Sequence, residues 1–290
     1  MIPFRAFASL FTFCLLTCGF VMGEDAQVKT GDKIAFLGDS ITQGGAGHPG
    51  GYVQLVGSGL AAAGVKVEII GAGISGHKSN QMLERLERDV ISKKPTWMTL
   101  SCGVNDVWHG ANGVPLEAYQ KNITEIVDKA QAAGIKVMIL TSTMITEDAK
   151  HDNNLKLALY NAFLLKLAAD KKCLLADLNA DMQAAIQPAA AGGKQVNLQL
   201  TSDGVHMGPL GDRLMARGIL KAFGLSDEQL KQANDAWLDA KTAGIQANRS
   251  LTLRQYEQLA ALAHGQGKSV PELVNEELGK SIEELLKKTP

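Results

Sequence analysis

Short apolar runs alternate with longer amphipathic segments along most of the chain. The short runs have the length and composition of buried strands and are expected at 34–37, 65–70, 97–101, 137–141 and 173–178. The segments between them repeat apolar residues at helical spacing, at 52–63, 79–92, 116–133 and 154–170, and a closing helix is expected at 210–223. This alternation predicts βαβ units, and hence an α/β fold in which helices cover both faces of a five-stranded parallel sheet.

The pattern changes after residue 225, where strand-like runs stop and polar helical sequence begins. Four pairs have the spacing of a capping box: Ser226/Gln229, Thr252/Gln255, Ser269/Glu272 and Ser281/Glu284. Gly244, Gly265 and Gly279 are expected to end the corresponding helices. We therefore expect a globular domain at 24–225 and a helical extension at 226–290.

Part of this extension, 250–286, loosely resembles a ribbon-helix-helix module. That fold normally dimerises and binds DNA, which does not suit an exported chain. The favoured interpretation is a plain helical extension that packs on the core or mediates self-association.

The first 23 residues differ in character from the rest. Arg5 is the only charged residue before Glu24, and the apolar run at 6–21 has the length of a signal peptide but is short for a membrane span. We expect removal of this leader and an exported protein, periplasmic or extracellular, without an integral membrane span. Anchoring as a lipoprotein through Cys18 is a minor alternative.

Composition adds two exclusions. The chain has 290 residues and a net charge of -1, which indicates neither a nucleic acid partner nor an anionic membrane surface. After the leader two cysteines remain, Cys102 at the end of one expected strand and Cys173 at the start of another. Opposite edges of a parallel sheet are separated by roughly 15–20 Å, at about 3.3 Å per residue, and a disulfide needs Cα atoms within about 7 Å. Two buried free thiols are therefore expected.

Candidate chemistry begins where the first expected strand ends, at Gly38-Asp39-Ser40. Chemistry in open α/β sheets gathers at the carboxyl ends of strands, so Ser40 is a candidate nucleophile. Alternatively, Asp39 and Ser40 only cap the following helix. The later motifs favour the nucleophile.

After the second expected strand, Gly71 to Gly76 matches the G-x-G-x-x-G pattern of dinucleotide-binding proteins. The context does not fit, because the pattern follows the second strand and the third ends at Ser101-Cys102 without an acid for the ribose. A dinucleotide-dependent oxidoreductase is therefore disfavoured. A glycine at position 76 could instead present its backbone N–H to a ligand.

Two further polar motifs follow later strands. Asn105 follows the third strand and offers a side-chain N–H for a developing oxyanion. Asp203 precedes His206 by three residues, a spacing at which the carboxylate can reach the imidazole and fix its tautomer. With Ser40 and Gly76, each motif is expected after a different strand, and the carboxyl ends of parallel strands lie on one edge of the sheet.

These residues resemble the SGNH (GDSL-type) serine ester hydrolase family. Its four blocks occur in order as GDS at 38–40, GISG at 73–76, GVND at 103–106 and DGVH at 203–206. The resemblance covers roughly 32–224 and implies a flavodoxin-like three-layer α/β/α sheet of order 2-1-3-4-5. It also implies that Ser40 is the nucleophile, His206 the general base and acid, and Asp203 the orienting acid. The N–H groups of Ser40 and Gly76 and the Asn105 side chain would form the oxyanion hole.

The expected activity is hydrolysis of short acyl esters, acetyl esters of carbohydrates above all, with no metal and no cofactor. This preference for acetyl esters of carbohydrates rests on the expected export and on the substrates known for the family. Asp39, Trp108 and His109 are the candidate substrate-binding residues. The alternatives are a lysophospholipase, thioesterase or arylesterase with the same mechanism, and a non-catalytic carbohydrate-binding protein. The sequence leaves the oligomeric state open.

Overall fold

Five parallel strands form one sheet in the order β2-β1-β3-β4-β5 in the computed structural model, which describes residues 26–186, 198–238, 240, 243 and 251–288. The strands are β1 (Lys33–Gly38), β2 (Glu68–Gly73), β3 (Trp97–Ser101), β4 (Lys136–Leu140) and β5 (Leu174–Ala176). The α/β class and the strand order are confirmed. The leader at 1–23 and Cys18 lie outside the described residues.

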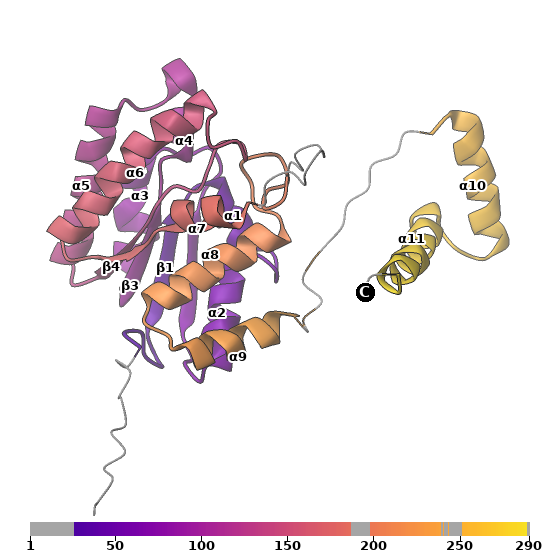
Figure 1. Cartoon of the computed structure of the whole chain (residues 1–290), viewed down its shortest axis with the longest axis horizontal. Helices are drawn as coiled ribbons and strands as arrows, with labels where there is room; N and C mark the ends of the chain where they lie inside the picture. Colours follow the sequence, from indigo (N-terminus) through magenta and orange to yellow (C-terminus); the bar gives the residue numbers. More distant parts are fainter. Residues whose placement is uncertain (1–25, 187–197, 239, 241–242, 244–250, 289–290) are drawn as a thin grey trace, which may run out of the picture. The chain divides into compact units, whose positions relative to one another are not determined.

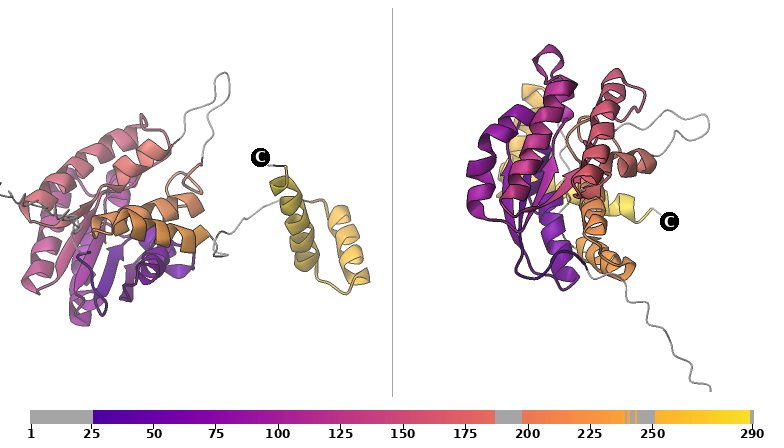
Figure 2. Two further views of the ribbon diagram at one scale, coloured as in Figure 1. Left: turned by 60° about the horizontal axis from the view of Figure 1, so that its bottom comes forward. Right: turned by 90° about the vertical axis from the view of Figure 1, so that its left-hand side faces the viewer.

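Helices cover both faces of the sheet (Figures 1 and 2). One layer contains α3 (Ser79–Asp89), α5 (Leu116–Ala132) and α6 (Asp152–Asp170); the other contains α2 (Tyr52–Ala62), α7 (Leu178–Ala185), α8 (Pro209–Ala222) and α9 (Asp227–Leu238). The short helices α1 (Ser40–Gly47) and α4 (Val104–Trp108) follow β1 and β3, and the 3-10 turns η1 (Ile91–Lys93) and η2 (Gly110–Asn112) complete the connections. Because both faces are covered, the interior of the central strands is buried and mostly apolar, as at Phe36 and Met98.

Two of the five strands differ from the prediction by more than one residue at an end. The second strand begins at Glu68, because Val65 and Lys66 belong to the connection from α2, where the Val65 N–H closes that helix on the Leu60 carbonyl. The fifth strand ends at Ala176, because the Asp177 carboxylate accepts a hydrogen bond from the Ala180 N–H and caps α7. The apolar residues at the start of the second predicted run therefore belong to a connection, and those at the end of the fifth predicted run belong to a helix.

The expected domain boundary after residue 225 differs from the compact division, which falls between Ala243 and Gly244. Helix α9 lies beside α2 (Figure 1), and Trp237 is buried between them with its indole N–H donating to the Leu55 carbonyl at 3.0 Å. The polar residues of α9 give its sequence the character of a separate extension, but its apolar face packs on α2 and belongs to the first unit.

The second unit contains α10 (Leu253–Gly265) and α11 (Val270–Leu286). The capping boxes at Thr252/Gln255 and Ser269/Glu272 are formed, as is the reciprocal pair Ser226/Gln229 before α9. The expected cap at Ser281/Glu284 and the stop at Gly279 are wrong, because α11 continues through these residues.

Two further points follow from the described residues. Among them, no helix is long and apolar enough to cross a membrane. Cys102 and Cys173 are free thiols, the first buried and the second half-buried.

Replacing Trp237 with alanine should destabilise the first unit. The change removes a buried indole from the α2–α9 contact and its hydrogen bond to Leu55, which costs about 3–5 kcal/mol in comparable cores. The matched control is Leu238→Ala, one residue later and 61% exposed, which should change the free energy of unfolding by less than about 0.5 kcal/mol. Urea unfolding measures both, and equal effects would mean that α9 is not part of the first unit.

Candidate active site

Ser40 is the first residue of α1, directly after the end of β1. The turn is tight: a Cβ on Gly38 would lie 1.9 Å from the Thr42 hydroxyl oxygen, so only glycine fits there. The Asp39 carboxylate caps the helix by accepting the Ile41 N–H at 3.0 Å. The capping interpretation is therefore correct for Asp39, and it leaves the Ser40 hydroxyl free to face another element.

A chain of hydrogen bonds joins Ser40 to two residues late in the sequence. Nε2 of His206 lies 2.9 Å from the Ser40 hydroxyl oxygen, and Nδ1 lies 2.7 Å from the Asp203 carboxylate. The other carboxylate oxygen of Asp203 accepts the backbone N–H groups of Val205 and His206. Burial favours the neutral form of Asp203, but the hydrogen bonds from His206 and Val205 outweigh it and lower its pKa.

The loop that carries Asp203 and His206 does not follow a strand directly, contrary to the prediction. Helix α7 comes after β5, and the loop is reached only later in the chain. It is closed on itself by an antiparallel bridge between Thr201 and Met207 and by the Ser202 N–H, which donates to the His206 carbonyl at 2.8 Å.

The segment around Gly76 packs against the start of α1. The Ile74 N–H donates to the Gly38 carbonyl at 3.1 Å, and the Ser75 N–H donates to the Gln43 side chain at 2.7 Å. Gly76 has a φ of +75°, in the left-handed region that favours glycine. A Cβ at this position would meet no other atom within 4 Å, so the space beside its backbone is open.

Asn105 on α4 joins this segment to Asp39. Its amide nitrogen lies 3.2 Å from the His77 carbonyl and 3.3 Å from the Asp39 carboxylate. Both distances are long for N–H···O hydrogen bonds. The structure thus brings Asn105 to the segment after Gly76 and to the residue before Ser40, at the shared carboxyl edge of β1, β2 and β3.

Asp106 also supports this carboxyl edge of the sheet, through hydrogen bonds with the start of α3. Its carboxylate accepts the Ser79 hydroxyl at 2.6 Å and the Ser79 N–H at 3.0 Å, which joins α4 to the start of α3. Burial raises its pKa. This aspartate therefore holds the loop after β3 against the start of α3.

Arg85 is a supporting residue that sequence reasoning missed. Its guanidinium, 4% exposed, donates to the carbonyls of Gly38 and Ala72 at 2.7 Å each, and its Nε donates to Nδ1 of His77 at 3.2 Å. It therefore joins the ends of β1 and β2. The available signal was a charge on the buried face of α3, next to Leu86.

The three candidate substrate-binding residues are placed differently. Asp39 is 2% exposed and its carboxylate is occupied by Ile41 and Asn105, which fits support of the site and not direct contact with a substrate. Trp108 is 44% exposed, and its ring lies 6.4 Å from the His206 ring in an edge-on arrangement. His109 is also exposed and lies beside Trp108.

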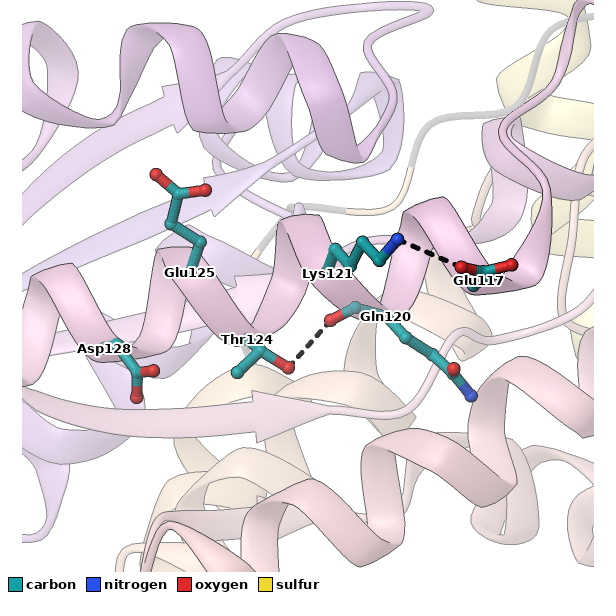
Figure 3. A pocket seen from close by; sticks show the side chains of 6 residues that line it. All are labelled: Glu117, Gln120, Lys121, Thr124, Glu125 and Asp128. Carbon is teal, nitrogen blue, oxygen red and sulfur yellow. Dashed lines mark hydrogen bonds and ion pairs between the residues drawn. The ribbon is translucent and has the colours of Figure 1, made fainter.

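Other candidate sites are less well formed. Gly71 to Gly73 lie within β2 and not in a turn between strand and helix, which does not fit a dinucleotide fingerprint. A depression on α5 is lined by exposed and half-buried side chains, with Lys121 paired to Glu117 (Figure 3), and contains none of the predicted site residues. Within the described part of the chain, no group of three or more acidic, histidine or cysteine side chains could hold a metal ion.

Comparison with known proteins identifies the family. The profile of the GDSL-like lipase/acylhydrolase family matches residues 36–214, more than half of the chain. The chain belongs to this family. It is accordingly a serine hydrolase that acts on carboxylic esters.

Individual relatives agree with the family. An acetylxylan esterase from Geobacillus stearothermophilus is 26% identical over 220 residues, which are 68% of this chain and 96% of that protein. The crystal structure of the acetyl xylan esterase AlAXEase is 36% identical, with a TM-score of 0.61 over 66% of this chain and 98% of that chain. The crystal structure of Axe2, an acetylxylan esterase from Geobacillus stearothermophilus, shares the fold at 24% identity and a TM-score of 0.61, over 69% of this chain and 97% of that chain.

The buried Asp39 carboxyl should make stability depend on pH. Burial raises its pKa to about 6 from 3.8, so the folded state holds this proton more tightly than the unfolded state. The protonated Asp39 carboxyl therefore makes its full contribution to the free energy of unfolding below pH 3.8. This contribution, at most roughly 3 kcal/mol, is lost as the pH rises through 6. Asp39→Asn should remove this decline when urea unfolding is compared at pH 4.5 and pH 8. Parallel pH curves for the two proteins would contradict it.

Proposed function

We propose that this enzyme removes acetyl groups from carbohydrate esters through an acyl-enzyme formed on Ser40. The observation that carries the proposal is the hydrogen-bond chain from Asp203 through His206 to Ser40, with distances of 2.7 and 2.9 Å. This is the arrangement of acid, base and nucleophile that activates a serine hydroxyl for acyl transfer. The acetylxylan esterases among the relatives support the choice of substrate.

Each residue has one step to perform. His206 takes the Ser40 proton on Nε2 as the hydroxyl oxygen attacks the ester carbonyl, and Asp203 stabilises the resulting imidazolium. The C–O bond to the sugar then breaks, and the sugar oxygen takes the proton from His206. Water repeats the sequence on the acetyl-Ser40 ester, releasing acetate and returning the proton to Ser40.

The oxyanion formed in each half-reaction needs donors that are already in place. The backbone N–H groups of Ser40 and Gly76 and the amide of Asn105 are proposed for this role. The two long hydrogen bonds of the Asn105 amide, to His77 and Asp39, are weak enough for a charged oxygen to compete with them. Removal of one oxyanion-hole donor costs about 3–4 kcal/mol in the transition state of a serine protease of another fold.

Trp108 is proposed to hold the sugar. Its exposed ring stands beside His206, where the alcohol part of the ester must leave. An indole face can pack on the C–H surface of a sugar ring, and His109 is close enough to add a polar contact. The same proposal favours substrates with small acyl groups, because contacts with the sugar and not with the acyl chain would hold the substrate.

Export is part of the proposal as well. Its support is the leader-like sequence at 1–23, with an apolar run at 6–21 after a single positive charge at Arg5. Export would bring the enzyme to polymeric carbohydrates outside the cell, which agrees with the proposed substrate class.

The nucleophile is tested with p-nitrophenyl esters of increasing chain length. Wild type should hydrolyse the acetate best, and Ser40→Ala should lower kcat by at least about 1,000-fold. Ser92→Ala, a change of the same kind on an exposed turn, is the matched control and should keep full activity. Preference for long acyl chains would favour a lipase-like substrate, and activity in Ser40→Ala equal to wild type would refute the nucleophile.

The sugar contact is tested separately with Trp108→Ala. The variant should raise KM for acetylated xylo-oligosaccharides by about 5- to 30-fold, because the sugar no longer covers an aromatic face when it binds. KM for vinyl acetate, which has no sugar, should not change. Trp108→Phe should retain most of the binding. An equal rise in KM for both substrates would mean that Trp108 contacts the acetyl group or shapes His206, and not the sugar.

A further inference from the structure

The loop with Asp203 and His206 has no strand beneath it, so its position must be fixed by contacts with other elements. The nearest set of such contacts comes from the connection between β4 and α6. There, the Thr146 N–H donates to the Gly204 carbonyl at 2.7 Å, directly beside Asp203. This connection lies far from the loop in sequence, and no motif of the family includes it.

Glu147 makes the densest contact. One oxygen of its carboxylate accepts the N–H groups of Leu200 and Thr201 at 2.8 Å each and the Thr201 hydroxyl at 2.7 Å. Its other oxygen accepts the Gln199 N–H at 2.7 Å. Four donors from three consecutive residues thus converge on one carboxylate, immediately before the turn that carries Asp203.

The Thr201 hydroxyl extends this contact toward the site. It donates to Glu147 and accepts the Gly204 N–H at 3.1 Å, so a continuous path runs from Glu147 through Thr201 to the residue after Asp203. Charge strengthens the arrangement: burial opposes the ionised form, but the hydrogen bonds from Gln199, Thr201 and Leu200 outweigh it and lower the pKa of Glu147.

The other side of Glu147 is also fixed. Asn154, near the start of α6, accepts the Ile145 N–H at 2.7 Å and donates to the carbonyls of Thr146 and Asp148 at 3.1 and 2.7 Å. Its side chain is 8% exposed. Glu147 therefore extends from a segment anchored on a long helix, and it can transmit that rigidity to the loop.

We propose that Glu147 is a positioning residue that holds the loop of Asp203 and His206 against Ser40. Its carboxylate contacts the loop and not the reacting groups, so it acts through the placement of His206. The inference rests on the proposed roles of Ser40, His206 and Asp203. A displacement of about 1 Å in such a geometry lowers catalytic rates by about 100-fold.

The test compares Glu147→Gln and Glu147→Ala with wild type on p-nitrophenyl acetate. Both should lower kcat, by about 10- to 100-fold, with KM within about twofold, because the loop carries the base and the binding surface lies elsewhere. Glu147→Gln should be the milder change, since its carbonyl oxygen can keep three of the donors while its amide faces the Gln199 N–H. The rate at which a small p-nitrophenyl phosphonate modifies Ser40 should fall in parallel.

The matched control is Asp148→Asn, the same loss of charge on the next residue of the same segment. Its carboxylate is exposed and accepts only the Lys150 N–H within the described contacts, so kcat should stay within about twofold of wild type. Thr201→Val removes one hydroxyl from the carboxylate and should lower kcat, whereas Thr201→Ser should restore it. These two variants keep the proposal testable if the Glu147 variants fold poorly.

The outcomes separate this inference from the proposed function. Folded Glu147→Ala with wild-type kcat would overturn the inference, as would equal losses in Thr201→Ser and Thr201→Val. A rise in KM with unchanged kcat would also overturn it, because it would place Glu147 in substrate binding. Full activity in His206→Ala would instead refute the proposed mechanism, whatever the Glu147 variants do.

Discussion

Burial of the parallel sheet on both faces is the constraint on which the rest of this structure depends. Helices cover the faces, so the central strands are mostly apolar and the polar groups of the candidate site gather where β1, β2 and β3 end. Ser40, Gly76 and Asn105 all follow those ends. Residues far apart in sequence therefore meet because their strands are neighbours in the sheet.

Polar groups brought to that edge are partly buried and need partners. Arg85 satisfies the carbonyls of Gly38 and Ala72, and Asp106 accepts two donors from Ser79. Leaving such groups unpaired costs about 1–3 kcal/mol each, so the partners also fix the segments that carry them. These buried hydrogen bonds fix the supporting segments relative to one another, which the order of the strands alone would not achieve.

The sequence predicted what depends on local pattern. The α/β class follows from the alternation of strands and helices, the positions of Ser40 and Asn105 follow from compact motifs after the strands, and the strand order was implied by the resemblance to the SGNH family. Packing between distant residues decides what local pattern does not: β2 begins at Glu68 because the preceding valines pack from a connection, and Trp237 joins α9 to the first unit by contacts with α2. The roles of Arg85 and Glu147 were not predicted for the same reason, because the residues next to them in sequence do not indicate which distant groups they contact.

The nucleophile and its base are held by different means. Ser40 sits on a strand end, where the sheet and the cap from Asp39 fix it through short-range structure. His206 sits on a loop that the sheet does not reach, so its position depends on long-range hydrogen bonds from the β4–α6 connection. A change at Glu147, whose carboxylate contacts the loop, is therefore expected to move the base without moving the nucleophile.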